Sequence, residues 1–380
     1  MVVEVSRGRA VESMHRVRGV ACSAAEDEES TRGDPPVLTY WRSAMKPFQA
    51  LPLFEDGVAG ALDLEPEDVA LICASHGGMR QHTERVAGLL RRLRLSEDHL
   101  HCGPHPPFDR DTAQMLSCAG RLPGRMHNNC SGKHAGMLAL AVHHGWPIDG
   151  YERLDHPVQR RIRDSLGAWM DHEPEEHHWA LDGCGVPTPR MPLSEMARAY
   201  SRLVRQARLG NAGARAVVDA MTTFPDLTSS PGRVPLEIMR ATKGRVLAKE
   251  GAEGVLCAAA VDDDWGLAVK VEDGAIRAVG PSVVQLMELA GLLRDGEREA
   301  LAEVSEAAIV NTLGVEVGRV RARPATGSGE DACCDSLPPW PPGPGTSGYG
   351  PCERWLPPRS GRPRRRSSSR ATCSWAFRRR

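Results

Sequence analysis

Apolar residues recur at intervals of three and four positions in several stretches of the chain. Such spacing places apolar side chains on one face of a helix and polar residues on the other. The predicted helices cover residues 84–95, 158–166, 194–204 and 282–294. Ser194 is of a residue type that favours the helix N-cap. We expect these helices to lie on the surface of a larger core.

Shorter apolar runs predict strands. Residues 69–73 are apolar and lead directly into Ser-His-Gly-Gly, which indicates a buried strand followed by a tight loop that holds Ser75. Residues 255–261 are strand-like as well. Residues 265–271 and 275–279, joined by the turn Glu-Asp-Gly, predict a β-hairpin. Helices combined with such a sheet indicate an α/β or α+β fold, with a mixed sheet flanked by helices.

The overall composition narrows the class of protein. With 380 residues, of which 41% are hydrophobic, the chain is long enough to bury a substantial core. Its 48 basic and 49 acidic residues nearly balance, and only 4% are aromatic, which argues against nucleic acid or an anionic membrane as a partner. No segment has the roughly 18 to 20 apolar residues that span a bilayer, and an apolar signal region is absent. We therefore expect a cytoplasmic protein whose 11 cysteines stay reduced and serve as core residues, metal ligands or nucleophiles.

The composition changes at residue 324. Residues 324–380 contain ten Pro, ten Arg and four Cys but no Val, Ile, Met or Lys, so they lack the apolar surface needed to fold. We expect a folded domain over residues 1–323, with a formal net charge of −7, and a disordered tail. The Arg-rich tail is either a segment that binds RNA or anionic lipid or an extension without function, such as out-of-frame translation of GC-rich DNA.

A Ser-x-x-Lys motif is the first candidate for chemistry. It comprises Ser43 and Lys46. If Ser43 begins a helix, with Pro47 tolerated in the first turn, the two side chains share one face and the amine reaches the hydroxyl. Such a pair can act as a nucleophile and its base. The alternative is an N-cap serine beside a solvated lysine.

Two further segments carry a hydroxyl and an amine. In Ala74–Gly78, Ser75 and two glycines at the expected strand end offer a hydroxyl and backbone N–H groups for an oxyanion. The alternative for this segment is a plain turn. Lys249 is followed by a Gly-rich turn just before the strand-like run 255–261, and the alternative there is a surface lysine.

Two cysteines stand in unusual settings. Within His127–Met137, Asn and Ser precede an apolar run, which places Cys130 at a helix N-terminus and Lys133 in the first turn. The positive end of a helix favours a thiolate and a neutral amine, whereas the alternative is a buried cysteine and an exposed lysine. Cys184 lies between two glycines, which allow a ligand to approach the backbone. His101–Pro106 has a Cys-x-x-His spacing without a second pair, which favours a binding or structural loop over a zinc finger.

Taken in order, the motifs resemble those of the rhizobial-type L-asparaginases, the asparaginase II family. They are RSAMKPFQALP, ASHGG, HCGPHPP, HNNCSGKHAGM, DGCGVP and KEGAEG. The resemblance extends over about residues 2–320 and implies a fold like that of the serine β-lactamases and glutaminases, and a homodimer. It also implies a catalytic site of two Ser and Lys tandems. These fall on Ser43 with Lys46 and on Ser75 with Lys249.

The resemblance further implies one zinc ion per chain. Its ligands fall on Cys130, Lys133 and Cys184. Two thiolates and a neutral amine fill three positions of a tetrahedral zinc and leave the fourth open. We expect the zinc to orient the substrate or fix the loop rather than to generate the nucleophile, because serine and lysine fill that role.

Other residues of the same motifs are implied to contact the substrate or to surround the metal. They are Arg42, His134 and Asp182. Lys270 lies in a segment that the family also shares, so it competes with Lys249 for the place of the second lysine.

These residue types suit the hydrolysis of a carboxamide. The reaction needs a nucleophile, a base that passes its proton to departing ammonia, and an oxyanion site. We hypothesise that Ser43 attacks L-asparagine and that Lys46 is its base. Ser75 and Lys249 then relay protons, and an acyl-enzyme is hydrolysed to aspartate, although the sequence leaves open which serine attacks. Alternatives are a glutaminase, a β-lactam hydrolase or a non-catalytic zinc-binding module.

Overall fold

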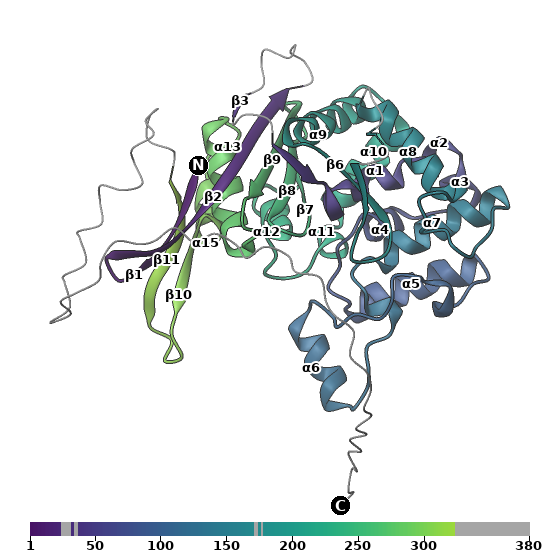
Figure 1. The fold of residues 1–380 in the computed structure, drawn as a ribbon, viewed down its shortest axis with the longest axis horizontal. Coiled ribbons are helices and arrows are strands. Elements are labelled where there is room, and N and C mark those ends of the chain that lie inside the picture. Colours follow the sequence, from purple (N-terminus) through teal and green to yellow (C-terminus); the bar gives the residue numbers. More distant parts are fainter. Residues whose placement is uncertain (24–31, 34–36, 171–173, 176–177, 324–380) are drawn as a thin grey trace, which may run out of the picture. The chain divides into compact units, whose positions relative to one another are not determined.

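An eight-stranded antiparallel sheet is the largest element of the computed structural model, which describes residues 1–23, 32–33, 37–170, 174–175 and 178–323 (Figure 1). Its strands lie in the order β10-β11-β1-β2-β9-β8-β7, and the short β3 pairs with β2. Because β1 pairs with both β2 and β11, strands from distant parts of the chain lie side by side. The bounds are β1 Val2–Arg7, β2 Ala10–Ser23, β3 Arg32–Gly33, β7 Val246–Glu250, β8 Val255–Ala260, β9 Trp265–Val271, β10 Glu306–Val310 and β11 Glu316–Arg323.

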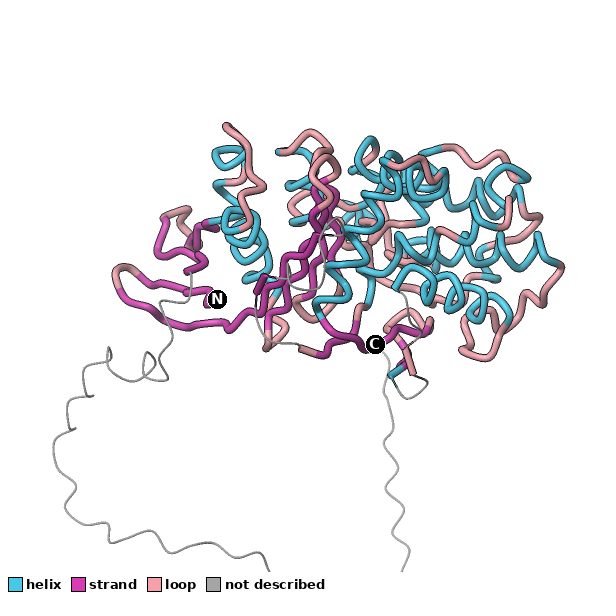
Figure 2. Tube along the Cα trace, turned by 90° about the horizontal axis from the view of Figure 1, so that it is seen from above, coloured by secondary structure: helices cyan, strands magenta, loops and turns pink. Residues whose placement is uncertain are grey.

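Many of the helices gather on one side of the strands (Figure 2). A small three-stranded sheet lies in the order β4-β6-β5, with β4 Leu38–Tyr40, β5 Trp179–Leu181 and β6 Pro187–Pro192. The helices are α1 Lys46–Ala50, α2 Pro52–Glu55, α3 Val58–Ala61, α4 Pro66–Ile72, α5 Arg80–Arg92, α6 Arg110–Cys118, α7 Ser131–His144, α8 Pro157–Met170, α9 Leu193–Arg208, α10 Ala212–Thr223, α11 Pro225–Thr228, α12 Val234–Ala241, α13 Val279–Leu289, α14 Glu297–Ala300 and α15 Ala302–Ser305. None of the helices in the described ranges is long and apolar enough to cross a membrane.

Helices α9 and α13 cover opposite faces of the central strands. Gly266 of β9 faces α9, where a side chain would collide with the carbonyl oxygen of Ala197. Gly19 of β2 faces α13, close to Leu286. Gly266 pairs with Cys22, which lies three residues after Gly19, so the pleat places the two glycines on opposite faces. The central strands are therefore buried between two layers of helix.

Residues 69–73, predicted as a buried strand, instead belong to α4 and its C-cap. Pro66 occupies the first turn, and the backbone N–H of Glu65 donates to Asp68 Oδ2 at 3.1 Å, which fixes the start of the helix. Because α4 packs against both α7 and α10, its run is apolar without a break. Such a run fits a buried helix as well as a buried strand. Ser75 thus follows a helix.

The predicted β-hairpin is wrong in its second half. Residues 265–271 form β9, but residues 275–279 form the 3₁₀ turn η6 (Ile276–Ala278) and the start of α13. Both edges of β9 are already paired, with β2 and β8, so no edge is free for a third strand. Helix α13 begins at Val279, before the predicted start at residue 282, and ends at Leu289 rather than at residue 294.

The other predicted elements are confirmed. Helices α5, α8 and α9 match the three helices predicted between residues 84 and 204, although α5 ends at Arg92 rather than at residue 95. The N-cap of α9 is Pro192 rather than Ser194. Residues 255–260 form β8, and Cys130 is the N-cap residue of α7. The mixed α/β class, with a sheet flanked by helices, is confirmed.

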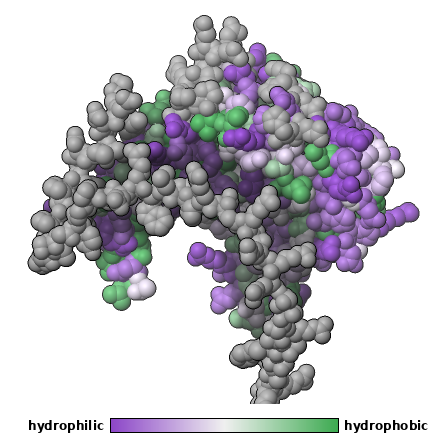
Figure 3. Space-filling view, viewed as in Figure 1, coloured by the Kyte–Doolittle hydropathy of each residue, from purple (hydrophilic) through white to green (hydrophobic). Residues whose placement is uncertain are grey.

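Two predictions are not tested by the described residues. The tail, residues 324–380, lies outside them, so its disorder stays a prediction. The homodimer also stays a prediction, because the structure contains one chain. Three apolar side chains are exposed at the end of the β10–β11 hairpin (Figure 3). They are Val310, Leu313 and Val315.

Candidate active site

Two lysine side chains converge on the hydroxyl group of Ser75. Lys46 begins α1, Ser75 lies in the loop after α4, and Lys249 lies in β7. Lys249 Nζ is 2.7 Å and Lys46 Nζ is 3.1 Å from Ser75 Oγ. All three residues are buried, with at most 3% of their surface exposed. The structure therefore forms one continuous chain of polar groups from Lys46 through Ser75 to Lys249.

The protonation of Lys249 is set by its surroundings. Burial and the positive charge of Lys46 lower the pKa of Lys249 to about 7, against an opposing effect of the Glu250 carboxylate. The Arg233 guanidinium lowers this pKa further and donates to Glu250 Oε1 at 2.5 Å. An amine that exchanges its proton near neutral pH is suited to act as a base.

Lys270 lies in a different environment. It is half-buried, and its Nζ donates to the carbonyl oxygen of Glu253 at 2.6 Å. Of the two lysines that compete for the second tandem, Lys249 is the one whose amine contacts Ser75.

Ser43 does not take part in this chain of contacts. It is partly exposed in the 3₁₀ turn η2 (Arg42–Met45), and its hydroxyl makes no hydrogen bond within the described residues. Its carbonyl oxygen accepts the backbone N–H of Lys46, so the two residues share one turn. The spacing predicts the Lys46 amine beside Ser43, but the amine contacts the Ser75 hydroxyl instead. The prediction fails because Ser75 lies in a distant segment of the chain, which only the tertiary fold brings to Lys46.

Arg42, directly before Ser43, has a strained backbone. Its φ of 56° lies in the left-handed region, which non-glycine residues seldom adopt. Two contacts hold it there. Its N–H donates to Thr188 Oγ1 at 2.9 Å, and its Nε donates to Asp182 Oδ1 at 2.6 Å. Both partners lie in or before β6, so the 179–192 segment orients the turn that presents Ser43.

Asp182 is a charged carboxylate despite its burial. Burial raises its pKa, but the charges of Lys133 and Arg42 and a hydrogen bond from the Gly183 N–H lower it overall. That N–H donates at 2.7 Å. The carboxylate thus joins the Arg42 turn to the loop that carries Cys184.

Three of the backbone N–H groups in the loop of Ser75, where the oxyanion site is expected, are already paired, and the site itself stays a prediction. The N–H of Ser75 donates to the Thr228 carbonyl at 3.0 Å, and that of His76 to the Asn129 carbonyl at 3.3 Å. The N–H of Gly78 donates to His76 Nδ1 at 3.1 Å. These donors are already paired because the loop is packed between two other segments, so they do not face a ligand.

Cys130, Lys133 and Cys184 form a second buried cluster. Lys133 lies in the first turn of α7, which approaches α4 so closely that a side chain at Gly132 would collide with the Leu71 carbonyl. The Nζ of Lys133 is 2.9 Å from Cys184 Sγ. The structure therefore brings Cys184 of one motif to Cys130 and Lys133 of another.

The charges in this cluster differ from the sequence expectation. A hydrogen bond from Cys130 and the charge of Lys133 hold the pKa of Cys184 well below its usual value. The same hydrogen bond raises the pKa of Cys130 to about 12. Burial lowers the pKa of Lys133, but the two sulfur atoms raise it more. In the protein without metal Lys133 is thus an ammonium paired with the Cys184 thiolate.

The donor set of this cluster fits zinc. Among the described residues no three His, Cys, Asp or Glu side chains gather in one place, so a metal here depends on Lys133 as the third ligand. Two sulfur atoms and an amine are ligands that zinc accepts once they lose their protons. Cys102, which the sequence assigns to a binding or structural loop, is buried and is affected by the charges of all three groups.

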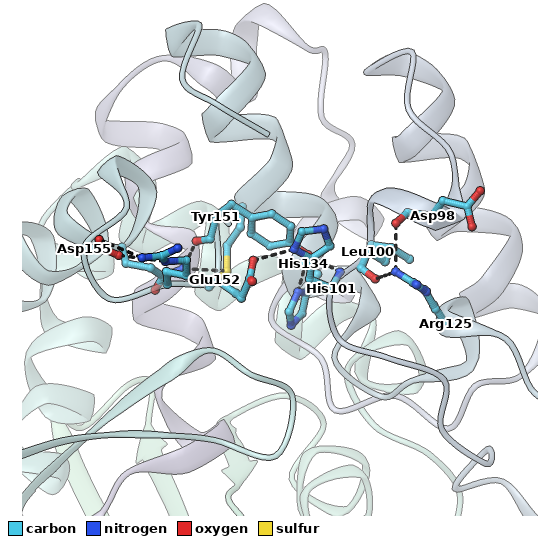
Figure 4. Close-up of polar contacts among 11 residues, drawn as sticks. Asp98, Leu100, His101, Arg125, His134, Tyr151, Glu152 and Asp155 are labelled. Carbon is cyan, nitrogen blue, oxygen red and sulfur yellow. Dashed lines mark hydrogen bonds and ion pairs between the residues drawn. The ribbon is translucent and has the colours of Figure 1, made fainter. Parts of the chain in front are cut away.

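His134 lies next to Lys133 and is fully buried. Its Nδ1 is 2.6 Å from Tyr151 Oη, which also accepts the backbone N–H of His101 at 2.9 Å (Figure 4). Burial and the charge of Lys133 lower the pKa of His134 to about 3, so the ring is neutral. Its Nε2 has no hydrogen-bond partner in the described part of the chain.

Sequence analysis misses several residues that shape the site. They are Tyr151, Thr188, Arg233 and Glu250. A signal was present only for Thr188 and Glu250, which lie beside or within recognised motifs. The others act through contacts with residues far away in the chain, and no local pattern reports such contacts.

Comparison with known protein families supplies the remaining evidence. The L-asparaginase II family matches residues 3–322, which is nearly the whole described part of the chain. No curated protein matches the sequence. Membership in this family implies a hydrolase with a small-molecule substrate. The expected resemblance is confirmed, and the chain belongs to the L-asparaginase II family.

Proposed function

We propose that the protein is an L-asparagine amidohydrolase that releases aspartate and ammonia through a serine acyl-enzyme. One observation carries the proposal beyond family membership. It is the placement of the Ser75 hydroxyl between two buried lysine amines, one of which has a pKa of about 7. A lysine with its usual pKa of about 10.4 is protonated at neutral pH and cannot accept a proton. The site therefore contains an amine that can act as a base at neutral pH, as the hydrolysis of an amide requires.

Ser43 is the nucleophile in this proposal. Its hydroxyl is free of hydrogen bonds within the described residues and is partly exposed, so a substrate can reach it. The Ser75 hydroxyl is enclosed by two amines and only 3% of the residue is exposed. Ser75 is better placed to pass a proton between Lys46 and Lys249 than to meet a substrate.

The reaction then follows from these positions. The neutral Lys249 amine first takes a proton from the Lys46 ammonium through the Ser75 hydroxyl, which leaves Lys46 neutral. The Ser43 oxygen then bonds to the carboxamide carbon of asparagine, and its proton passes to the Lys46 amine. The carbon–nitrogen bond breaks, and the nitrogen takes up a proton and leaves as ammonia. Water hydrolyses the ester to aspartate and restores the serine hydroxyl. Lys249 exchanges protons with Lys46 through Ser75, which keeps the base available in both half-reactions.

Arg42, Asp182 and His134 bind the substrate in this scheme. The Arg42 guanidinium and the Asp182 carboxylate, paired at 2.6 Å beside Ser43, complement the carboxylate and ammonium groups of an amino acid. Held by Thr188 and Asp182, the Arg42 turn is fixed before the substrate arrives, which lowers the entropic cost of binding.

Zinc belongs to the second cluster, with Cys130, Lys133 and Cys184 as its ligands. When bound, it supplies a fixed positive charge that orders the Cys184 loop and so orients Asp182. Elemental analysis of protein purified without added metal should give about one zinc per chain, and Cys130→Ala and Cys184→Ala should lose it. Chelated enzyme should retain turnover with a raised KM, and a complete, zinc-reversible loss of turnover would contradict a role in orientation.

The test of function is ammonia release by the purified full chain. We expect hydrolysis of L-asparagine in preference to L-glutamine and to a chromogenic β-lactam. Preference for glutamine or the lactam would support the corresponding alternative hydrolase, and no release from any of them would favour a non-catalytic zinc-binding module.

The identity of the nucleophile has its own test. Ser43→Ala and Ser75→Ala should each lower kcat by orders of magnitude, and the double variant should be little worse, because the residues act as a unit. Mass spectrometry of enzyme quenched during turnover should find the ester on Ser43. An ester on Ser75 would exchange the roles of the serines. Ser117→Ala, at an exposed serine of α6, is the matched control.

A further inference from the structure

The buried ring of His134 has one nitrogen without a partner. The residue is fully buried, and its Nε2 makes no hydrogen bond within the described residues. Buried polar atoms are almost always paired, because an unpaired donor or acceptor loses its hydrogen bond to water. The ring is close enough to Lys46 and Lys133 for both charges to affect it. The unpaired nitrogen therefore lies in the region of the candidate catalytic and zinc residues.

The other nitrogen of the ring belongs to a directed chain of hydrogen bonds. The backbone N–H of His101 donates to Tyr151 Oη at 2.9 Å, and Tyr151 Oη lies 2.6 Å from His134 Nδ1 (Figure 4). A backbone N–H can only donate, so it occupies a lone pair of the phenol oxygen. The phenol proton needs an acceptor, and His134 Nδ1 is the acceptor that the described residues provide.

The direction of this chain decides where the imidazole carries its proton. Because Tyr151 donates to Nδ1, that nitrogen accepts with its lone pair and carries no proton. The one N–H proton of the neutral ring is therefore on Nε2. We propose that Tyr151 is a positioning residue that holds His134 as the Nε2–H tautomer, so that this N–H donates to an oxygen atom of the bound amino-acid substrate. The substrate half of the proposal rests on the proposed asparaginase function, and the tautomer does not.

The anchoring of Tyr151 supports a positioning role. Its backbone carbonyl accepts the Gln159 side chain at 2.9 Å, and its ring packs edge-on against that of His134. The His101 ring, which contacts Glu152 at 2.7 Å, is not part of the directed chain, because His101 contributes only its backbone N–H. Among the described residues, the hydroxyl of Tyr151 is thus the side-chain group that hydrogen-bonds to the His134 ring.

The assigned tautomer has two chemical consequences. An N–H donor in a buried site pairs with a carboxylate or carboxamide oxygen, and a ligand without such an oxygen leaves it unpaired. A metal ion needs the lone pair of a nitrogen. In this tautomer the Nε2 of His134 presents no lone pair to zinc, although the residue adjoins Lys133.

Nitrogen NMR of the ¹⁵N-histidine-labelled full chain tests the tautomer directly. Protonated and unprotonated ring nitrogens have distinct shifts, and the signals of His134 are identified by their loss in His134→Gln. We expect a protonated Nε2 in the wild type and a mixture of both tautomers in Tyr151→Phe. His101→Ala, which keeps the backbone N–H and Tyr151, should preserve the wild-type pattern. A protonated Nδ1 in the wild type, or an unchanged tautomer in Tyr151→Phe, would overturn the proposal.

The substrate half is tested on the same samples with L-aspartate as the probe. Saturating L-aspartate should move the Nε2–H signal of wild-type His134, and Tyr151→Phe should lower kcat/KM for asparagine roughly tenfold or more with zinc content unchanged. No movement with L-aspartate would overturn the contact with substrate. If the enzyme hydrolyses no asparagine at all, the proposed function fails, whereas the tautomer is still decided by the wild-type spectrum.

Discussion

Two buried lysines, Lys249 and Lys133, face the same loss of water but carry opposite pKa shifts. Lys249 lies beside a second amine, that of Lys46, and its pKa falls to about 7. Lys133 lies beside the sulfur atoms of Cys130 and Cys184, and its pKa is raised. Burial alone disfavours the ammonium in both places. The charge of the nearest neighbour decides which lysine moves protons and which one balances a thiolate.

This difference separates two kinds of chemistry within one buried region. A pKa near 7 makes Lys249 useful in both directions of proton transfer at neutral pH. The ammonium of Lys133 stabilises the Cys184 thiolate, and a metal must displace its proton before it can bind there. The two lysines should therefore respond differently to the same substitution.

The largest expected effect is on turnover. Lys249→Met removes the base and should lower kcat by about 10²- to 10⁴-fold, whereas Lys133→Met should mainly raise KM and abolish zinc binding. Steady-state kinetics with L-asparagine and metal analysis of both variants make the comparison. Lys270→Met is the matched control, because that amine contacts backbone carbonyls away from Ser75. A normal kcat in Lys249→Met would remove this lysine from the mechanism.

The second effect is on stability, measured by urea unfolding of metal-free protein at pH 7. Lys133→Met leaves the Cys184 thiolate without its cation and should lower the free energy of unfolding by about 3–5 kcal/mol. Lys249→Met replaces an amine that burial disfavours and should raise it by about 1 kcal/mol. Equal changes of the same sign would show that burial, rather than the neighbouring charge, dominates both sites.

A third effect is a shift in the pH dependence of the rate. The rate should rise with pH around 7, because Lys249 accepts a proton only in its neutral form. Arg233→Gln removes a positive neighbour of Lys249, which raises the pKa of Lys249 and should move the rise in rate to higher pH. Glu250→Gln removes a negative neighbour of Lys249, which lowers that pKa and should move the rise in rate to lower pH. A profile with its maximum near pH 5 would instead indicate a carboxylate base.

The smallest expected effect belongs to the tail. Deletion of residues 324–380 should leave the Tm and the kcat of the protein unchanged, because their composition cannot support a packed core. Thermal unfolding and kinetics of the shortened chain provide the measurement. Protection of the tail in limited proteolysis, or unfolding of the domain on its removal, would contradict the predicted boundary at residue 324.

Much of the local structure was predictable from the sequence. Apolar spacing locates α5, α8 and α9, and the Asn and Ser residues before an apolar run place Cys130 at the N-cap of α7. These features depend on neighbours within a turn or two of helix. The prediction fails for residues 69–73 and 275–279, where the outcome depends on what packs against the segment.

The sequence by itself determined the inventory of the site, because its hydroxyls, amines and thiols lie in short motifs with distinctive spacing. Only the tertiary structure decided how those groups pair. The Lys46 amine contacts the hydroxyl of Ser75 rather than that of Ser43, although Ser43 is only three residues away from Lys46 in the chain. The hydroxyl of Tyr151 contacts the ring of His134. A pKa or a tautomer depends on charges and donors within a few ångströms. Residues that are distant in the chain supply them, so the protonation of this site is a property of the fold.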